Sequence, residues 1–226
     1  TRRFGVSAPA DPHLAPELII HAYRQGLFPM ADAVDNPETF WVDPHMRGIL
    51  PLDGFHVPRR LMRTIRQAPF DMHIDTDFRQ TIEACRMPAA DRPSSWINDE
   101  IVSAYCKLHA MGYAHSVECW SGEQLVGGLY GVRIAGAFFG ESMFSRQTDA
   151  SKVALTYLVA RLKYARFTLL DCQFANDHLT RFGLKEIPRT AYHAKLQTAL
   201  AQPADFHLMP VNLSPVEVLH AVGHKS

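Results

Sequence analysis

The sequence of 226 residues predicts an α+β fold, in which a mixed sheet with crossover helices follows a small N-terminal domain. Three alternating apolar segments between residues 114 and 143 indicate an antiparallel meander. Helical and strand-like patterns then alternate from residue 149 to residue 201, as expected where helices cross over a sheet. The first third of the chain has a different character, because prolines divide it into short extended pieces.

Pro37, Pro44 and Pro51 mark this first third as a separate unit. From residue 75 onward the helices and strands become longer and more regular. After Pro203 the chain is again rich in proline and histidine. We therefore expect a small N-terminal domain at 1–74, a larger domain at 75–203 and a C-terminal tail at 204–226.

The expected N-terminal elements begin with a helix at 15–25, whose apolar residues recur at helical spacing. Gly26 is suited to end this helix, and Pro58 is suited to the first turn of a second one. The other elements of this region are short strands. The expected order is a helix at 15–25, strands at 40–42 and 48–50, a helix at 58–66 and a strand at 70–74.

Polar residues mark the starts of the later helices: Asp75 or Thr76 for the first, Asn98 for the second, and Asp149 or Ser151 for the third. The expected helices cover 75–87, 98–111, 149–164, 176–183, 188–201 and 214–221. The expected strands cover 114–120, 124–132, 135–143, 167–172 and 184–187.

Composition is that of an ordinary globular protein, with 47% hydrophobic and 20% charged residues. The 23 basic and 23 acidic side chains cancel, so affinity for a polyanion must come from local clustering. The four cysteines form no Cys-x-x-Cys pair, and we expect reduced thiols and a cytoplasmic location. No apolar run approaches the length of a membrane span. We expect no membrane partner and a monomer.

Basic residues do cluster on the helix expected at 58–66. At about 100° per residue its arginines occupy roughly a third of the circumference, and Leu61, Met62 and Ile65 lie opposite. One interpretation is a solvated helix face. The other is a surface that binds nucleic-acid phosphates, which suit arginine forks. Residues 45–70 hold five arginines against one acidic residue: Arg47, Arg59, Arg60, Arg63 and Arg66.

Polar residues also interrupt two apolar segments. Glu141 follows Phe138-Phe139-Gly140, and Asp171 and Gln173 follow Leu170. A buried ionised carboxylate costs several kcal/mol unless it is paired. Glu141 could form a structural salt bridge, and Asp171 could cap a helix. The functional interpretation is that these groups meet a substrate.

Nine short motifs occur in a distinctive order from about residue 14 to residue 206: residues 26–30 (GLFPM), 55–60 (FHVPRR), 96–97 (WI), 115–118 (HSVE), 125–131 (LVGGLYG), 140–145 (GESMFS), 150–152 (ASK), 171–173 (DCQ) and 187–189 (IPR). Together they closely resemble the leucyl/phenylalanyl-tRNA–protein transferase family. The resemblance implies a catalytic domain with a GNAT-like acyltransferase fold and a small N-terminal domain. It implies transfer of leucine or phenylalanine from aminoacyl-tRNA to protein N-termini, usually Lys or Arg, which marks the product for degradation by the N-degron pathway.

The same resemblance assigns roles to the residues. Asp171 and Gln173 would be catalytic, and Glu141 would bind the polar end of a substrate. Trp41 and Trp96 would stack on the terminal adenine or pack against the donor. The arginines would contact the tRNA. The expected pocket for the aminoacyl side chain consists of Leu129, Leu158, Leu162 and Leu170; ordinary core packing is the alternative for these leucines. Leu158 and Leu162 replace phenylalanines familiar in other members.

Two other functions stay open at this point. An acyl-CoA-dependent N-acyltransferase would share the fold class, although residues 145–149 offer no glycine for binding pyrophosphate. A tRNA-binding adaptor without catalysis would keep the arginine face but would have no need of Asp171 and Gln173. The histidines show no His-Glu-x-x-His spacing, and no Walker or Rossmann glycine pattern occurs. We expect no metal and no cofactor.

Overall fold

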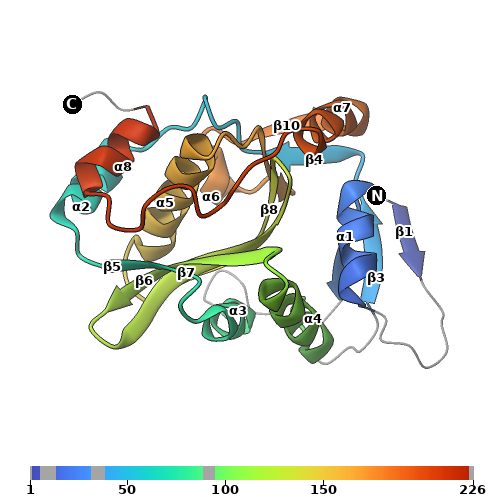
Figure 1. Cartoon of the computed structure of the whole chain (residues 1–226), viewed down its shortest axis with the longest axis horizontal. Coiled ribbons are helices and arrows are strands. Elements are labelled where there is room, and N and C mark those ends of the chain that lie inside the picture. The colour runs from blue at the N-terminus through green and yellow to red at the C-terminus, as the bar shows by residue number, and fades with distance from the viewer. Residues whose placement is uncertain (1, 6–13, 32–38, 89–94, 224–226) are drawn as a thin grey trace.

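The structure, a computed structural model, describes residues 2–5, 14–31, 39–88 and 95–223. Two sheets organise the described residues. A seven-stranded sheet has the order β10-β4-β9-β8-β7-β6-β5, and a three-stranded sheet has the order β1-β3-β2 (Figure 1). The fold is therefore α+β with a separate N-terminal region, as the sequence predicts.

The strands of the small sheet are β1 (Arg2–Gly5), β2 (Phe28–Ala31) and β3 (Thr39–Asp43). Those of the large sheet are β4 (Met46–Ile49), β5 (Asp71–Ile74), β6 (Ala114–Ser121), β7 (Gln124–Ile134), β8 (Ala137–Ser145), β9 (Leu169–Gln173) and β10 (Lys185–Pro188). The helices are α1 (Pro16–Arg24), α2 (Arg59–Gln67), α3 (Phe78–Arg86), α4 (Asp99–Ala110), α5 (Ala150–Tyr164), α6 (Asp177–Thr180), α7 (Arg189–Leu200) and α8 (Pro215–Ala221).

The large sheet separates two hydrophobic clusters. The first cluster joins one face of the sheet to α1, α3, α4, α7 and the small sheet, and includes Tyr23, Tyr105 and Tyr192. The second cluster joins the other face to α2, α5 and α8. Figure 1 shows α5 and α8 on one side of the sheet and α3 and α4 on the other. A side chain on the large sheet therefore faces either the N-terminal region or α5.

The expected meander is confirmed, because β5 to β8 pair antiparallel in succession. The mixed character of the sheet comes from β8 and β9, which pair in parallel across the crossover helix α5. Their pairing runs from Ala137↔Leu169 to Phe139↔Asp171. Beyond that point β8 continues to Ser145 without further pairing to β9. Glu141 and Gln173 each lie two residues past this last pair.

Local chemistry explains several of the element boundaries. Gly26, which follows α1, adopts φ +79°, a left-handed conformation that suits glycine at the end of a helix. Asn98 caps α4 by accepting a hydrogen bond from the backbone N–H of Ile101, as expected. The start of α3 differs from the expectation, because Asp77 rather than Asp75 or Thr76 accepts a hydrogen bond from the N–H of Gln80. Asp75 instead contacts His115 and Ser116.

Two strands expected in the N-terminal domain belong to the large sheet. β4 pairs with β9 and β10, and β5 pairs with β6. The short, proline-flanked segments at 46–49 and 71–74 resemble those of a small domain, but their hydrogen-bond partners are distant in the chain. The domain boundary at residue 74 stays a prediction. The expected helix of the tail is present as α8, where Ser214 and Glu217 form a capping box.

Candidate active site

An ion pair between Arg47 on β4 and Asp171 on β9 lies at the centre of the candidate site. Nη2 of Arg47 is 2.6 Å from Oδ2 of Asp171, and Nε is 2.9 Å from Oδ1. Both side chains are buried, with 1% and 0% exposure. The hydroxyl of Tyr192 on α7 donates a third hydrogen bond to Oδ2 at 2.7 Å. Asp171 is thus a buried charge whose oxygens are paired from two directions.

The environment of Arg47 corrects its expected role. Its Nη1 donates to the carbonyl of Gly26, and its guanidinium lies over the rings of Phe28 and Tyr192 at 4.4 and 4.5 Å. Burial lowers its pKa and the neighbouring Asp171 raises it, with a net shift upward. Arg47 therefore belongs to this buried network and has no exposed face for a tRNA phosphate.

Gln173 connects Asp171 to Glu141. Its backbone N–H donates to Oδ1 of Asp171 at 2.9 Å, and its side-chain Nε2 donates to Oε1 of Glu141 at 3.0 Å. The backbone at Gln173 adopts φ +56°, in the left-handed region that side-chain-bearing residues seldom occupy. Such strain costs on the order of 1–3 kcal/mol and often marks functional positions. The strain here directs the amide towards Glu141 where β8 and β9 separate.

Glu141 also meets two tyrosines. The hydroxyl of Tyr23 on α1 donates to Oε1 at 2.7 Å, and that of Tyr105 on α4 lies 3.3 Å from Oε2. The two hydroxyls are also hydrogen-bonded to each other. Burial raises the pKa of Glu141 to about 8, although the hydrogen bond from Tyr23 opposes this shift. Glu141 can therefore take up or release a proton near neutral pH.

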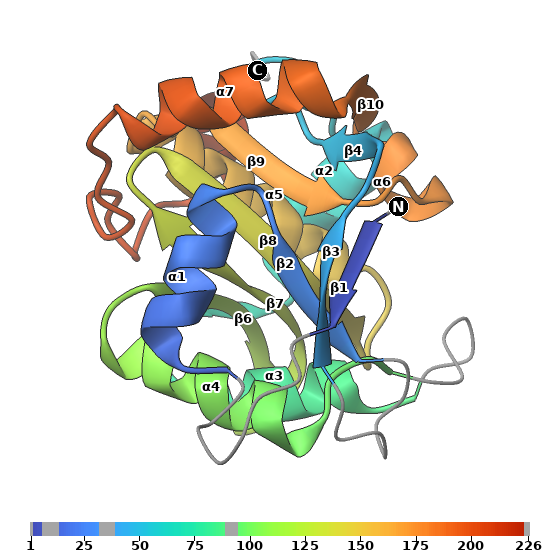
Figure 2. The ribbon, with the colours of Figure 1, turned by 90° about the vertical axis from the view of Figure 1, so that its right-hand side faces the viewer.

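These contacts form one continuous polar network, which we call the Glu141–Asp171 network: Tyr23, Arg47, Tyr105, Glu141, Asp171, Gln173 and Tyr192. Its members come from α1, β4, α4, β8, β9 and α7, so it forms only when the N-terminal region docks on the sheet (Figure 2). Sequence reasoning found Glu141, Asp171 and Gln173. It missed the tyrosines, because nothing in a helical tyrosine distinguishes a site residue from a core residue.

The four leucines expected to line the aminoacyl pocket lie on the other face of the sheet. Leu129, Leu158, Leu162 and Leu170 are each at most 3% exposed and pack in the second cluster, against α5. The contacts of the Glu141–Asp171 network come from the first cluster instead. Leu170 and Asp171 are neighbours on β9 whose side chains point to opposite faces. The four leucines therefore lie in one cluster, on the face of the sheet opposite to the polar residues.

The two tryptophans differ in exposure. Trp41 on β3 is 6% exposed and belongs to the first cluster, as a core residue would. Trp96, which precedes the cap of α4, is only partly buried and packs against the same cluster. Trp96 therefore has the more accessible ring.

The division of faces on α2 is confirmed. Leu61 and Ile65 are buried, whereas Arg59, Arg60, Arg63 and Arg66 are exposed. In Figure 1, α2 lies beside α8, at the far end of the long axis from α1. A ligand that touched both the arginines and the Glu141–Asp171 network would have to extend along the molecule.

Comparison with known proteins identifies the family of this chain. The family model described as leucyl/phenylalanyl-tRNA protein transferase matches residues 49–197, and the model of its N-terminal domain matches residues 13–45. The matches indicate an aminoacyltransferase as the class of protein. More narrowly, this chain belongs to the leucyl/phenylalanyl-tRNA–protein transferase family.

Three relatives carry the name leucyl/phenylalanyl-tRNA–protein transferase. The protein of Hyphomonas neptunium is 58% identical over 192 residues, which cover 85% of this chain and 74% of the relative. That of Phenylobacterium zucineum is 56% identical over 191 residues, covering 84% and 86%. That of Nitrobacter winogradskyi is 49% identical over 219 residues, covering 96% and 97%. Among the described residues, no helix has the length and apolar character to cross a membrane.

The raised pKa of Glu141 predicts a pH-dependent effect on stability. The native state keeps the Glu141 proton up to about pH 8, whereas the unfolded chain loses it near pH 4.5. Since the native state binds the extra proton, the stability contributed by this group falls as pH rises through that window. Glu141→Gln removes the titration, so its stability relative to the parent chain should increase from about pH 5 to about pH 8.5.

Urea unfolding at several pH values measures this difference. Glu123→Gln, a change in the exposed turn between β6 and β7, is the matched control and should show no such trend. A constant difference between Glu141→Gln and the parent chain across the window would contradict the raised pKa.

Proposed function

We propose that this chain transfers leucine or phenylalanine from aminoacyl-tRNA to the N-terminal α-amine of proteins that begin with Lys or Arg. The observation that carries the proposal is the hydrogen bond from Gln173 to Glu141, beside the buried Arg47–Asp171 pair, in a chain of this family. The transferred residue would mark its acceptor for degradation through the N-degron pathway. We place this activity in the cytoplasm and assign it to a monomer.

The reaction requires that the two reactants be positioned correctly, and it does not require a strong base. An aminoacyl ester is already activated relative to the amide product, and an N-terminal amine with a pKa near 8 is partly unprotonated at neutral pH. As the amine nitrogen attacks the carbonyl, a C–N bond forms and the ester C–O bond breaks. The electron pair leaves with the ribose oxygen, which takes up one proton as the amine nitrogen loses one. Holding the two reactants in line supplies much of the rate.

Gln173 is well placed for this positioning. Its amide nitrogen donates to Glu141, so the amide oxygen points away from that carboxylate and can accept a hydrogen bond from the incoming amine. Arg47 and Tyr192 hold Asp171, and Asp171 holds the backbone of Gln173. Asp171 then acts by fixing the strained backbone from which the amide extends.

Glu141 is matched to an ammonium group. Its pKa is raised to about 8, close to that of an α-amine. The deprotonated fraction of Glu141 can therefore accept one proton from a bound ammonium group and leave a neutral amine. The donor and the acceptor each bring an α-amine to the reaction. A buried carboxylate that exchanges protons near neutral pH serves either one.

The remaining residues supply substrate binding in this proposal. The donor pocket expected from Leu129, Leu158, Leu162 and Leu170 stays a prediction, because these side chains face α5 on the side of the sheet opposite to the Glu141–Asp171 network. Trp96 stacks on the terminal adenine, and Trp41 packs behind the donor. The arginine face of α2 binds the phosphates of the tRNA. The mixed sheet with its parallel β8–β9 pair supports a GNAT-like catalytic domain.

Incubation with charged tRNA tests the function directly. With leucyl-tRNA or phenylalanyl-tRNA and a peptide beginning with Lys, we expect mass spectrometry to find one residue added to the peptide N-terminus. The same peptide with a blocked N-terminus is the control. Consumption of acetyl-CoA without aminoacyl transfer would support an acyl-CoA enzyme instead, and tRNA binding without any transfer would support an adaptor.

Removing the Gln173 amide should slow the transfer. Because misplacement of a reactant by about 1 Å costs on the order of 100-fold, we expect Gln173→Ala to lower single-turnover transfer by roughly that factor. Donor binding, measured separately with charged tRNA, should change little. Gln197→Ala, an exposed change on α7, is the control. Normal turnover by Gln173→Ala would remove this residue from the mechanism.

Removing two arginines from α2 should weaken tRNA binding without unfolding the protein. Each lost phosphate contact reduces the slope of log affinity against log salt by about 1. Arg59→Ala with Arg63→Ala should therefore lower the slope by about 2 and leave the melting temperature nearly unchanged. Lys107→Ala with Lys195→Ala removes the same charge from exposed sites on α4 and α7. Equal weakening by both double variants would show that charge alone, and not this face, governs binding.

A further inference from the structure

The segment that follows α7 brings His207 against two residues of the large sheet. Nδ1 of His115 on β6 lies 2.7 Å from Oδ2 of Asp75, and Nε2 of His207 lies 3.3 Å from the same oxygen. One donor atom from each of these residues lies within 4.8 Å of the others. Two imidazole nitrogens thus converge on one carboxylate oxygen, in a part of the molecule that the proposed transfer reaction does not use.

The carboxylate of Asp75 is held in a fixed orientation. Asp75 follows β5 with φ +56°, and its backbone N–H donates to the carbonyl of Ser116 at 3.2 Å. The N–H of Ser116 donates in return to Oδ1 of Asp75 at 2.7 Å. Oδ2 is left facing the histidines. A hydrogen bond to the second oxygen of a carboxylate is the kind of support that orients metal ligands in proteins.

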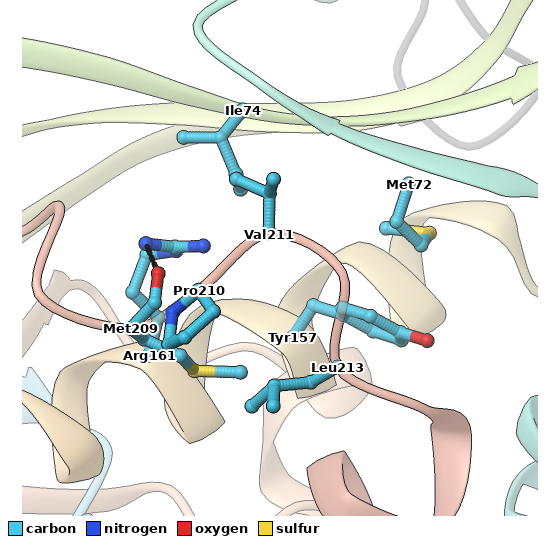
Figure 3. A pocket seen from close by; sticks show the side chains of 8 residues that line it. All are labelled: Met72, Ile74, Tyr157, Arg161, Met209, Pro210, Val211 and Leu213. Atoms are coloured by element: carbon cyan, nitrogen blue, oxygen red, sulfur yellow. Dashed lines mark hydrogen bonds between the residues drawn. The ribbon is translucent and has the colours of Figure 1, made fainter.

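The tail that carries His207 is anchored independently of Asp75. Phe206 is fully buried and stacks on the His115 ring at 4.2 Å and on Phe138 at 5.5 Å. Nη1 of the buried Arg161 on α5 donates to the carbonyl of Phe206. It also donates to the carbonyl of Met209 (Figure 3). These contacts fix the backbone around His207 and the plane of the His115 ring. The cluster is therefore preorganised, although its ligands are far apart in the sequence.

The set of donors determines which cation would fit. Two imidazole nitrogens and a carboxylate oxygen suit Zn²⁺ and related transition metals, whereas Ca²⁺ and Mg²⁺ prefer oxygen ligands alone. Bond lengths of about 2.0–2.1 Å place neighbouring ligands of tetrahedral zinc roughly 3.3 Å apart. The observed spacings of 2.7 and 3.3 Å are close to this value. The His207 side chain is 57% exposed, which gives a cation access from solvent.

The carboxylate of Glu118, which lies near this cluster, has a different set of hydrogen-bond partners. Glu118 on β6 accepts hydrogen bonds from the N–H of Asp77, the hydroxyl of Ser116 and the indole N–H of Trp120. Its oxygens are thus satisfied by neutral donors that hold β6 to the start of α3. In the Asp75 cluster, by contrast, Nε2 of His115 is buried without a hydrogen-bond partner. Without a metal, Asp75 accepts a hydrogen bond from Nδ1 of His115. A cation bound at Nδ1 would replace that proton, and the unpartnered Nε2 could carry the proton of the neutral ring.

We propose that Asp75, His115 and His207 bind one divalent transition-metal ion, best matched by Zn²⁺, which fastens the C-terminal segment to β5 and β6. The ion is structural and takes no part in aminoacyl transfer, so this proposal does not rest on the proposed function. It differs from the sequence expectation of no metal. Each ligand stands alone in the chain, and only the docked tail brings them together.

Calorimetric titration of the chelator-treated full chain with ZnCl₂ tests the proposal. We expect one equivalent to bind with an affinity that falls at least about tenfold in His207→Ala, since even supporting residues of metal sites have effects of 10–100-fold. His207 is exposed, so this change leaves the core intact. Asp75→Asn, which keeps the shape of the side chain, should weaken binding similarly. His21→Ala, an exposed change on α1, should bind as the parent chain does.

Hydrogen exchange supplies a second readout that does not depend on activity. Zn²⁺ should slow backbone exchange across residues 204–213 in the parent chain and in His21→Ala, but not in His207→Ala. The proposal is overturned if the parent chain binds no zinc. It is equally overturned if His207→Ala and Asp75→Asn bind zinc as tightly as the parent chain, because the ion would then sit elsewhere.

Discussion

The buried ion pair between Arg47 and Asp171 is the interaction on which the rest of the site depends. Either charge alone in this interior would be strongly destabilising, so each residue requires the other. Arg47 also binds the carbonyl that follows α1 and lies against Phe28 of the small sheet. Asp171 also binds Tyr192 of α7 and the backbone of Gln173. One pair of charges thus fixes the N-terminal region, the large sheet and the backbone of Gln173 relative to one another.

Three carboxylates on the large sheet have different hydrogen-bond partners: Asp171 and Glu118 are buried, and Glu141 is partly buried. Asp171 has a cation, and Glu118 has three neutral donors. Glu141 has two tyrosine hydroxyls and an amide but no direct ion pair among the described residues, and burial raises its pKa to about 8. A carboxylate whose charge is fully compensated by its hydrogen-bond partners stabilises the fold. Glu141, whose charge is less fully compensated, can exchange a proton near neutral pH.

Sequence reasoning succeeded where the signal was local. Periodicity placed α2 and its arginine face, and alternation placed the meander. An apolar context singled out Glu141 and Asp171, which lie in one hydrogen-bonded network, and their roles stay predictions. It failed where long-range contacts decide. β4 and β5 look like pieces of a small domain until β9 and β6 provide their partners. Proximity in the sequence groups Arg47 with the α2 arginines, because it cannot show that Asp171 lies on β9, the neighbour of β4. Asp75 looked like a helix cap, although its hydrogen-bond partners are on β6.

The way that the polar network is assembled has a consequence for the history of the chain. The two family models meet between residues 45 and 49, and Arg47 stands in the interval. Tyr23 and the Gly26 carbonyl come from the first matched stretch, and Glu141 and Asp171 come from the second. Neither stretch holds a complete set of hydrogen-bonding partners. If recombination joined one stretch to the corresponding stretch of another protein, buried polar groups would lose their hydrogen-bond partners. Selection should therefore keep the two stretches together as they are inherited.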